Sequence, residues 1–522
     1  MHRDTLRRSA SIAIATLAAF LSLARPLAGS ELRIGYPSDI VTEDPADHRD
    51  RWTEIVLGNV FDGLLTRDPS MRLVPEISEV WNQVAPQIYE FRLRSGVRLH
   101  DGRELTAEDV VFSFKRLITP GALGGRTSPR KGLLGPLATV TAVGPLAVRF
   151  ELDSPWPIFP AMLPFQQIVG RASSAKAEGE IVSETAAGLI GSGPFRLVQR
   201  FPNDAIMFER HDAYFGGATD IPPVEPACVD RMVVNIVPGN ESRVAGLLAG
   251  DFDIVVDVSP HSIPVLERNA KTNVRVVDGT RSFFVALNTR EPPFDDPKVR
   301  RAVAHALDRE QLIKEHLGGK ATRIDGILSP HAFGKNKHLP RYNHDPERAH
   351  ALLNEAGYPD GLDVELDVTR QLFPLAESIV VQLATVGIRA QVIDGDAAEI
   401  NKKWHGGKTG KGKHMWLKSW GNASLDPVGI FQPTHRTGGR GNASGYSNSS
   451  LDALLITAAT EQHPGRRADL YRRAEAIANR ELPYIYLWVP KDIYGVSNRV
   501  RGFAAAPDGR LNLQDVCIDG TE

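Results

Sequence analysis

The sequence predicts a mixed α/β protein with more than one domain. At 522 residues, the chain is longer than one hydrophobic core normally supports, so we expect two or three domains. Short strand-like runs alternate with capped amphipathic helices along most of the chain. The composition, 42% hydrophobic and 24% charged residues, is ordinary for a globular protein. The formal net charge of −2 gives no basic excess, so a nucleic-acid partner is not expected.

The N-terminal residues predict a cleaved export signal. Arg7 and Arg8 lie in a basic segment, residues 12–23 form an apolar run, and residues 28–30 are small, as a cleavage site requires. We expect residues 1–30 to be removed and the mature protein to be periplasmic. A signal anchor is the alternative, but the apolar run is short for a membrane span. No cysteine lies directly after this run, so a lipid anchor at that point is not expected. The choice between Sec and Tat export stays open.

The segment from residue 89 to residue 118 predicts a strand, a turn and a helix in that order. Residues 89–94 alternate apolar and charged side chains, the pattern of a half-buried strand. The Asp-Gly pair at 101–102 predicts a turn. Thr106 and Asp109 have the spacing of a capping-box variant, and the apolar positions that follow predict the buried stripe of a helix.

Later helices are predicted from their end signals. Asp-Pro pairs at 296–297 and 345–346 begin two of them. Gly357 ends the second, and Gly387 ends a further helix over 375–386. Another amphipathic helix is expected over 468–481, and the expected strands include 283–287, 364–368 and 484–488.

The chain contains only two cysteines, Cys228 and Cys517. An exported protein with one pair can close a single disulfide, which would join the middle of this chain to its C-terminus. The alternative is two separate buried thiols, because sequence carries no distance between them.

The run GVRLHDGRELTAEDVVFSFKRL, residues 96–117, resembles the signature of the family 5 extracellular solute-binding proteins. These proteins are the dipeptide-, oligopeptide- and nickel-type binding subunits of ABC importers. Further segments resemble the family in the same order: 191–195, 209–215, 243–254, 296–309, 345–357 and 446–455 with 480–483. The resemblance implies ligand capture without catalysis or a cofactor, a monomer, and ABC permease and ATPase subunits as partners.

The family resemblance also implies an architecture. We expect the two-lobed α/β fold of periplasmic binding proteins, in its large peptide-binding form, with two crossing segments that act as a double hinge. Lobe one would hold residues 31–62, 189–283 and 491–522, with an extra subdomain over 63–188, and lobe two would hold 284–490.

The sequence contains two enzyme-like patterns. Residues 407–413 resemble a P-loop, but His414 stands where a Mg²⁺-binding Ser or Thr is needed. Ser173 with Lys176, the K-T-G at 408–410 and the Y-S-N at 446–448 match the short motifs of penicillin-binding enzymes in the wrong order. An exported hydrolase is therefore only the alternative of a different class.

Metal binding is not predicted, because the fifteen histidines show no metal-ligand spacing. Nickel binders share the implied fold, however, so His405, His414 and His435 are the nearest candidates for a chelated metal. The competing interpretation is that they are solvent-exposed loop histidines.

The segment 415–433 carries the best candidates for ligand contacts: Trp416, Trp420, Asn422 and Asp426. Aromatic rings supply flat apolar walls, and a few polar groups fix a ligand's orientation. In the family the corresponding region faces the cleft between the lobes. The two tryptophans share one face of the predicted strand, so a shared core position is the alternative.

Here the sequence departs from its peptide-binding relatives. In those proteins an Asp three residues after the tryptophan pairs with the ligand's α-ammonium, whereas this chain has Ala423. A buried ammonium without a counter-charge would cost several kcal/mol. Either another carboxylate serves, or the ligand lacks a free α-amine there, which leaves opine-, sugar- and nickel-chelate-type ligands open. Arg370 is a candidate for a ligand carboxylate, with a surface charge as the alternative. Tyr446, Asp39 and Asn288 complete the candidates.

Overall fold

The computed structural model describes residues 30–68, 70–171, 188–216, 227–405 and 412–519. The predicted export signal before residue 30 lies outside these ranges. So do Ser173, Lys176 and the K-T-G at 408–410. Within the described ranges, no helix has both the length and the apolar character that a membrane crossing needs.

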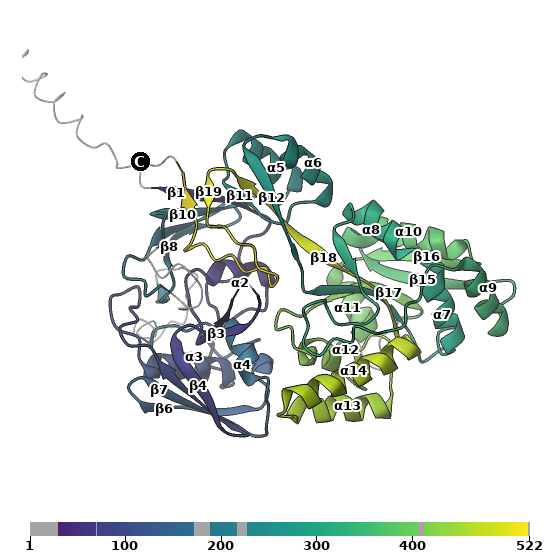
Figure 1. Ribbon diagram of the computed structural model, residues 1–522, viewed down its shortest axis with the longest axis horizontal. Helices are drawn as coiled ribbons and strands as arrows, with labels where there is room; N and C mark the ends of the chain where they lie inside the picture. The colour runs from purple at the N-terminus through teal and green to yellow at the C-terminus, as the bar shows by residue number, and fades with distance from the viewer. Residues whose placement is uncertain (1–29, 69, 172–187, 217–226, 406–411, 520–522) are drawn as a thin grey trace, which may run out of the picture.

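The chain forms two lobes that lie side by side and share one twelve-stranded sheet (Figure 1). Lobe one contributes β1 (Glu31–Tyr36), β8 (Phe195–Phe201), β9 (Ala205–Arg210), β10 (Arg231–Ile236) and β11 (Ile254–Val255). Lobe two contributes β13 (Arg281–Leu287), β14 (Ala321–Arg323), β15 (Leu362–Thr369), β16 (Ile388–Gly395) and β17 (Met415–Gly421). The strands β12 (Thr272–Asp278) and β18 (Tyr484–Ser497) complete the sheet.

β18 is the strand that joins the two lobes. Its first part, Tyr484 to Trp488, pairs antiparallel with β13 in lobe two. Its second part, Lys491 to Ser497, pairs antiparallel with β12 in lobe one. Because β12 leads into β13 after two residues, the chain crosses between the lobes on two adjacent strands. The strand predicted over 484–488 is therefore too short, since the pairing partners change along a much longer strand.

A smaller layer of lobe one carries a four-stranded sheet with the order β4-β5-β7-β6. Its strands are β4 (Ser78–Ala85), β5 (Ile88–Leu93), β6 (Leu137–Gly144) and β7 (Ala147–Leu152), and α3 (Ala107–Ile118) packs on β6 and β7. The short elements β2 (Leu65–Arg67), β3 (Leu73–Pro75) and α4 (Phe159–Met162) lie beside it. The predicted capping box of Thr106 and Asp109 is present. Phe114 meets Phe150 of β7 edge to face at 4.8 Å, so the predicted helical stripe is buried against the sheet.

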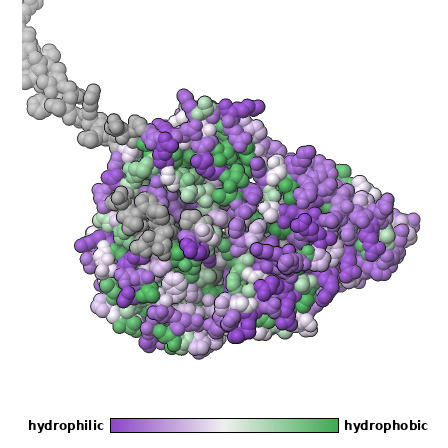
Figure 2. Space-filling model, in the orientation of Figure 1, coloured by the Kyte–Doolittle hydropathy of each residue, from purple (hydrophilic) through white to green (hydrophobic). Residues whose placement is uncertain are grey.

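Lobe two is the more helical lobe. Its helices are α7 (Pro297–Ala306), α8 (Arg309–Leu317), α9 (Pro346–Glu355), α10 (Phe373–Ala384), α11 (Ala397–His405), α12 (Phe431–His435), α13 (Ser449–Thr460) and α14 (Pro464–Glu481). The predicted Asp-Pro starts are confirmed: Asp296 accepts a hydrogen bond from the amide of Lys298 at 2.7 Å, and Asp345 from that of Arg348 at 2.9 Å. Figure 2 shows a mainly hydrophilic surface over this lobe.

Lobe one also contains α2 (Arg51–Leu57), α5 (Asn240–Ala249), α6 (Ile263–Arg268) and the short strands β19 (Val500–Arg501) and β20 (Cys517–Ile518). Cys228 and Cys517 form a disulfide with their Cα atoms 5.1 Å apart. The bridge ties the C-terminal strand to the segment before β10, so both of its ends lie in lobe one. Each lobe has its own buried apolar core.

Candidate functional site

In each lobe, parallel strands of the shared sheet end together at one edge. In lobe one, β10 and β11 run parallel to β1, so their carboxyl ends lie together. In lobe two, β16 and β17 run parallel to β15 and also end together. Open α/β sheets bind ligands at the carboxyl ends of their strands. The candidate site therefore lies between the lobes, beside the crossing strands.

A pocket lies at this edge in lobe one, lined by residues that include Tyr36, Arg51, Trp52, Asp257, Asp492 and Tyr494. Arg51 begins α2, and its guanidinium contacts the carboxylate of Asp492 on β18 at 2.7 Å. Tyr36, the last residue of β1, donates a hydrogen bond to the carbonyl of Trp52 at 2.9 Å. Burial raises the pKa of Asp257. The pocket is thus polar and lies where β18 enters lobe one.

Arg281 approaches the same region from lobe two. It is the first residue of β13, and its Nη1 donates to the hydroxyl of Ser419 at 3.2 Å. Burial lowers the pKa of Arg281, and the positive charge of Arg51 adds to this effect, while Asp492 opposes it. Arg281 and Arg51 are therefore neighbours across the crossing strands.

Arg440 of lobe two packs on an aromatic ring at the end of β17. Arg440 of lobe two places its guanidinium 4.8 Å from the ring centroid of Trp420, whose indole N–H donates to the carbonyl of Gly429 at 3.0 Å. Burial lowers the pKa of Arg440. Arg49 of lobe one has its pKa lowered by burial and then by the positive charge of Arg440.

These three arginines, Arg49, Arg281 and Arg440, form no ion pair with any acidic residue in the described part of the chain. The nearby acids are already engaged. Asp492 pairs with Arg51, and Glu54 pairs with Arg130 at 2.6 Å.

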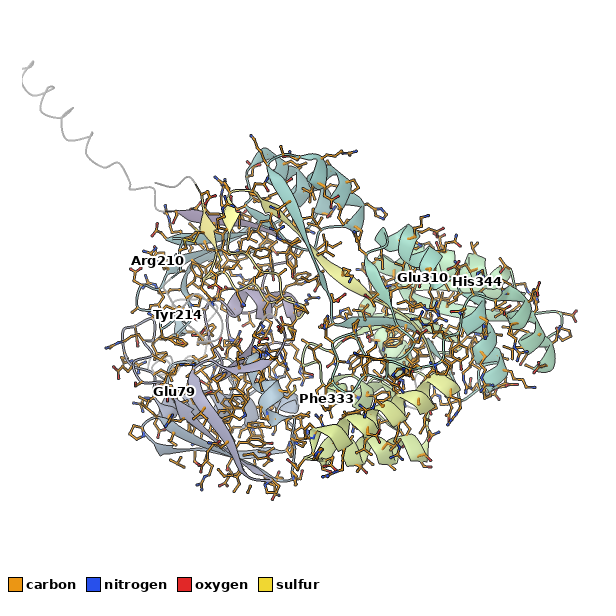
Figure 3. All side chains as sticks on the ribbon, in the orientation of Figure 1. Glu79, Arg210, Tyr214, Glu310, Phe333 and His344 are labelled. Atoms are coloured by element: carbon orange, nitrogen blue, oxygen red, sulfur yellow. A yellow bond between two sulfur atoms is a disulfide. The ribbon has the colours of Figure 1, made fainter. Side chains whose placement is uncertain are left out.

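Several direct contacts hold the lobes together, including the one between His331 of lobe two and Asp278 at the end of β12 at 3.1 Å. Arg67 at the end of β2 in lobe one donates from Nη2 to the carbonyl of Ser424 in lobe two at 2.9 Å. At the outer rim, Gln83 donates to the side-chain oxygen of Gln462 at 3.0 Å. Phe333, labelled in Figure 3 where lobe two faces lobe one, donates its amide to the carbonyl of Leu425 within lobe two at 2.8 Å. The structure thus has its lobes in contact.

The structure separates the predicted ligand residues of segment 415–433. Trp416 is 2% exposed and stacks on Trp404 in the core of lobe two, with ring centroids 5.6 Å apart. Trp420 is half-buried at the edge of the sheet. Asn422 is buried, and its Oδ1 accepts from the hydroxyl of Ser424 at 2.9 Å. Its Nδ2 has no hydrogen-bond partner among the described residues.

Asp426 is engaged within lobe two. Both of its carboxylate oxygens accept from Nη2 of Arg467 at 2.6 Å, and Oδ1 also accepts from the amide of Val428 at 3.1 Å. A carboxylate that is buried, paired with a guanidinium and capping a turn has little capacity left for a ligand ammonium. Its geometry is that of a structural Asp-Pro.

Three further candidates are held by internal hydrogen bonds. Asp39 accepts from Arg200 at 2.8 Å and from the amides of Ile40 and Asn203. Tyr446 donates to Glu481 at 2.6 Å. Asn288 is 1% exposed and donates from its side chain to the carbonyl of Lys413 at 3.1 Å. Each stabilises the loop or strand end on which it lies.

Arg370 directly follows β15, at the carboxyl edge of lobe two. Its side chain is 64% exposed and lies 3.6 Å from Asp394 and 3.3 Å from Asp396. The arginines of the site, by contrast, were missed by sequence reasoning. Arg49 and Arg51 precede and begin a helix, while Arg440 lies in a glycine-rich loop, and none carries a local signal of cleft position.

The histidines do not form a metal centre, and no group of potential metal ligands is found among the described residues. His435 is fully buried and lies 2.8 Å from the hydroxyl of Tyr486, and burial lowers its pKa to about 3. The expectation of a solvent-exposed loop histidine is therefore wrong for His435, which lies in a helix of the core. His414 accepts from the amide of Glu365 at 3.0 Å, and the side chain of His405 lies outside the described part.

Comparisons with known proteins agree with this architecture. Residues 72–442 match the family model "Bacterial extracellular solute-binding proteins, family 5 Middle". The chain is 28% identical over 478 residues to heme-binding protein A of Haemophilus influenzae, covering 86% of this chain and 85% of that protein. It is 26% identical over 524 residues to the glutathione-binding protein GsiB of Escherichia coli strain K12, covering 98% of both.

Solved structures with the same fold extend over almost the whole chain. HbpA2 from Haemophilus parasuis superposes with a TM-score of 0.82 at 25% identity, covering 94% of this chain and 100% of that one. A dipeptide-binding protein from Pseudoalteromonas in complex with Met-Leu gives 0.78 at 22% identity, covering 94% and 100%. The predicted two-lobed periplasmic binding protein fold is confirmed.

Proposed function

Because the chain belongs to the family 5 bacterial extracellular solute-binding proteins, we propose that it captures peptides or peptide-like solutes between its lobes for an ABC importer. The family binds substrates and does not transform them, and we propose no bond chemistry for this chain. The observation that carries the proposal is the pair of crossing strands, β12–β13 and β18, with a polar pocket beside them. Two rigid lobes on two strands can close on a solute by bending at the crossing.

Closure would be coupled to binding through contacts that exist only when the lobes meet. The hydrogen bond from Arg67 to Ser424 is such a contact. A solute that touches both lobes stabilises the closed form more than the open form, so it shifts the population toward closure. The closed shape is then the one that a membrane permease would recognise, and ATP hydrolysis by a partner subunit would release the solute inward.

The site lacks a free carboxylate that could pair with a ligand ammonium, and this limits the classes of ligand. Ala423 stands at the position where peptide-binding relatives place an amine-pairing Asp, and Asp426 and Asp39 are engaged by arginines. Relatives are named for glutathione, heme and dipeptides, which makes these classes the first to test. Backbone hydrogen bonds and bridging waters would hold a peptide-like solute while tolerating varied side chains. Opine-, sugar- and nickel-chelate-type ligands are the alternatives.

The cellular setting follows from the same proposal. The relatives are extracellular or periplasmic binding proteins, and residues 1–30 have the pattern of an export signal. We propose that the mature protein is a periplasmic monomer that docks on permease subunits. Expression of the full chain with detection in the periplasmic fraction, and N-terminal sequencing of the purified product, would test this.

A thermal-shift screen tests the function itself. The mature protein would be heated with dipeptides, glutathione, heme, opines, sugars and nickel chelates, with small-angle scattering on each hit. A ligand at 100 times its dissociation constant adds about 2.7 kcal/mol of stability, which such a screen detects. We expect at least one peptide-like solute to stabilise the protein and to make it more compact. Turnover of a hit, or hits that leave the scattering profile unchanged, would contradict the proposal.

A further inference from the structure

Lobe one contains a cavity of about 410 Å³ that is separate from the cleft between the lobes. It lies beside β8, the last strand in the sheet order, and β9, β10, β1 and β11 stand between β8 and the crossing strand β18 (Figure 1). Neighbouring strands are about 4.8 Å apart, so β8 and β18 are separated by roughly 24 Å along the sheet. The cavity shares no lining residue with the polar pocket beside the crossing strands. A solute held here would therefore leave the cleft free.

The cavity has the size and the walls of a small-molecule site. Pockets for small ligands enclose roughly 300–1,000 Å³ and are lined mainly by apolar side chains. The apolar lining includes residues at and after the end of α2 and residues of β8, namely Leu57, Val60, Phe61, Leu197 and Val198. The first three are buried, whereas Val198 is 49% exposed and so marks the side on which the cavity reaches the surface.

Glu43 gives this apolar cavity a buried carboxylate. The residue is 5% exposed, and its Oε2 has no hydrogen-bond partner among the described residues. Its Oε1 lies 3.9 Å from the guanidinium of Arg200, which already donates to Asp39 from Nη2 at 2.8 Å and from Nε at 3.2 Å. Burial raises the pKa of the Glu43 carboxyl, because the charged form loses water without gaining a close counter-charge.

The other ionisable residues that line the cavity are balanced or neutral. Arg196 pairs with Glu209 at 2.9 Å, and Asp101 pairs with Arg103 at 2.7 Å. Burial lowers the pKa of His100 to about 4, so its ring carries no charge at neutral pH. Among the described lining residues, the charge without a close partner is therefore the buried carboxylate.

We propose that this cavity is a second binding site, and that it takes a small apolar molecule that carries an amine. The ammonium would pair with Glu43, and the hydrocarbon part would pack on Leu57, Phe61 and Leu197. A hydrogen bond between charged groups is stronger than one between neutral groups, and it gains further strength where water is excluded. The inference goes beyond the proposed function, because it concerns a site outside the cleft.

The buried carboxylate also discriminates against other solutes. An anion would bring a second negative charge to Glu43, and like charges repel. An apolar molecule without a polar group would leave the carboxylate buried and without a donor, which costs free energy. An amine is the class that both fills the apolar space and supplies the missing counter-charge.

Matched probes test the charge of the ligand. Ligand-detected NMR on the mature protein would compare phenethylamine, 2-phenylethanol and phenylacetate, which share a phenyl ring and differ in the charge of the polar group. We expect phenethylamine to bind about tenfold more tightly than 2-phenylethanol, the factor that corresponds to one hydrogen bond between charged groups. Phenylacetate should bind more weakly than either. Equal affinities of the amine and the alcohol, or no binding of phenethylamine, would overturn the proposal.

Substitutions decide whether the amine is bound in this cavity. Glu43→Gln keeps the shape of the side chain and removes its charge, so the affinity for phenethylamine should fall about tenfold. Val198→Trp adds bulk at the open side and should lower the affinity as well. Glu241→Gln on α5 and Val265→Trp on α6 make the same changes at exposed positions of lobe one and should leave the affinity unchanged.

Two results would move the amine out of the cavity. Wild-type affinity in Glu43→Gln, or an equal loss in its control Glu241→Gln, would overturn the proposal. If Glu43→Gln does not fold, wild-type affinity in Val198→Trp overturns it instead.

Competition separates this inference from the proposed function. Phenethylamine would be titrated into the mature protein saturated with the peptide-like hit of the thermal-shift screen, and we expect its affinity to stay the same. Displacement of the amine by that hit would place the amine in the cleft and overturn this inference, while the proposed function would stand. A screen without any hit counts against the proposed function alone, because the substitutions at the cavity are tested with phenethylamine.

Discussion

Replacing Arg67 by alanine is expected to weaken ligand binding without direct contact to the ligand. Arg67 is 6% exposed, and its Nη2 donates to the carbonyl of Ser424 across the lobe boundary at 2.9 Å. Its Nη1 donates within lobe one to the carbonyl of Met71 at 2.9 Å. Burial lowers the pKa of Arg67 to about 10, so the group stays charged at neutral pH. Only the bond to Ser424 is lost when the lobes open.

The size of the effect follows from that one bond. A hydrogen bond to a charged group contributes about 1.5–3 kcal/mol net. A loss of about 2 kcal/mol from the closed form lowers the closing equilibrium constant about 30-fold. Where the open form predominates without ligand, the apparent dissociation constant rises by the same factor.

Calorimetric titration of the best hit from the thermal-shift screen measures this change. Arg72→Ala is the matched control, because Arg72 is 75% exposed in its side chain and pairs with Asp68 inside lobe one at 2.6 Å. We expect a large increase in the dissociation constant for Arg67→Ala and little change for Arg72→Ala. Thermal unfolding of the ligand-free variants measures any loss of stability caused by missing contacts within lobe one. Equal affinities for Arg67→Ala and the wild type would refute the closing role of this contact.

Three further predictions concern stability. Replacing Cys228 and Cys517 by serine should cost about 2–5 kcal/mol of unfolding free energy, measured by denaturant titration, and leave ligand affinity unchanged because both ends of the bridge lie in lobe one. Asp426→Ala should destabilise the protein by about 3–5 kcal/mol, because it leaves Arg467 buried and unpaired. Burial raises the pKa of the Glu475 carboxyl to about 7. The folded state therefore holds this proton more tightly than the unfolded chain, and the stability that results is present at acid pH. It is lost as the pH rises from the carboxyl's pKa in the unfolded chain toward about 7. Glu475→Gln should remove this loss, which unfolding measurements at pH 5 and pH 8 would show.

Each of these has a contradicting result. A reduced protein that keeps its full unfolding free energy would deny a stabilising role to the disulfide. An Asp426→Ala variant that keeps the wild-type free energy of unfolding but no longer binds the ligand would place Asp426 in the binding site. A Glu475→Gln variant with the same pH dependence as the wild type would assign that dependence to other groups.

Elements whose ends are encoded locally were predicted well from the sequence. Asp296 and Asp345 precede prolines and cap helices as expected, because a cap depends on a few consecutive residues. The Thr106–Asp109 box is another example. The family signature then predicted the two-lobed fold, which the comparisons confirm.

The length of β18 and the contacts of the candidate ligand residues depend on residues that are distant in the sequence. β18 extends to Ser497 because β12 pairs with its second half, and no local pattern records that partner. Trp416 and Trp420 share a strand face in the sequence, yet Trp404 of α11 covers the first while the second stays half-buried. Asp426, a ligand candidate that also matched a structural Asp-Pro of the family, pairs with Arg467, which lies 41 residues further along the chain.

By itself, the sequence determined the helix caps, the strand periodicity and membership of a binding-protein family, since these depend on neighbouring residues or on a conserved order of segments. Only the tertiary structure decided which charges pair with each other. Arg51 and Asp492 are 441 residues apart in the chain, yet the guanidinium of one contacts the carboxylate of the other at 2.7 Å. This ion pair forms because the fold places the start of α2 beside β18, and no local sequence pattern records that proximity.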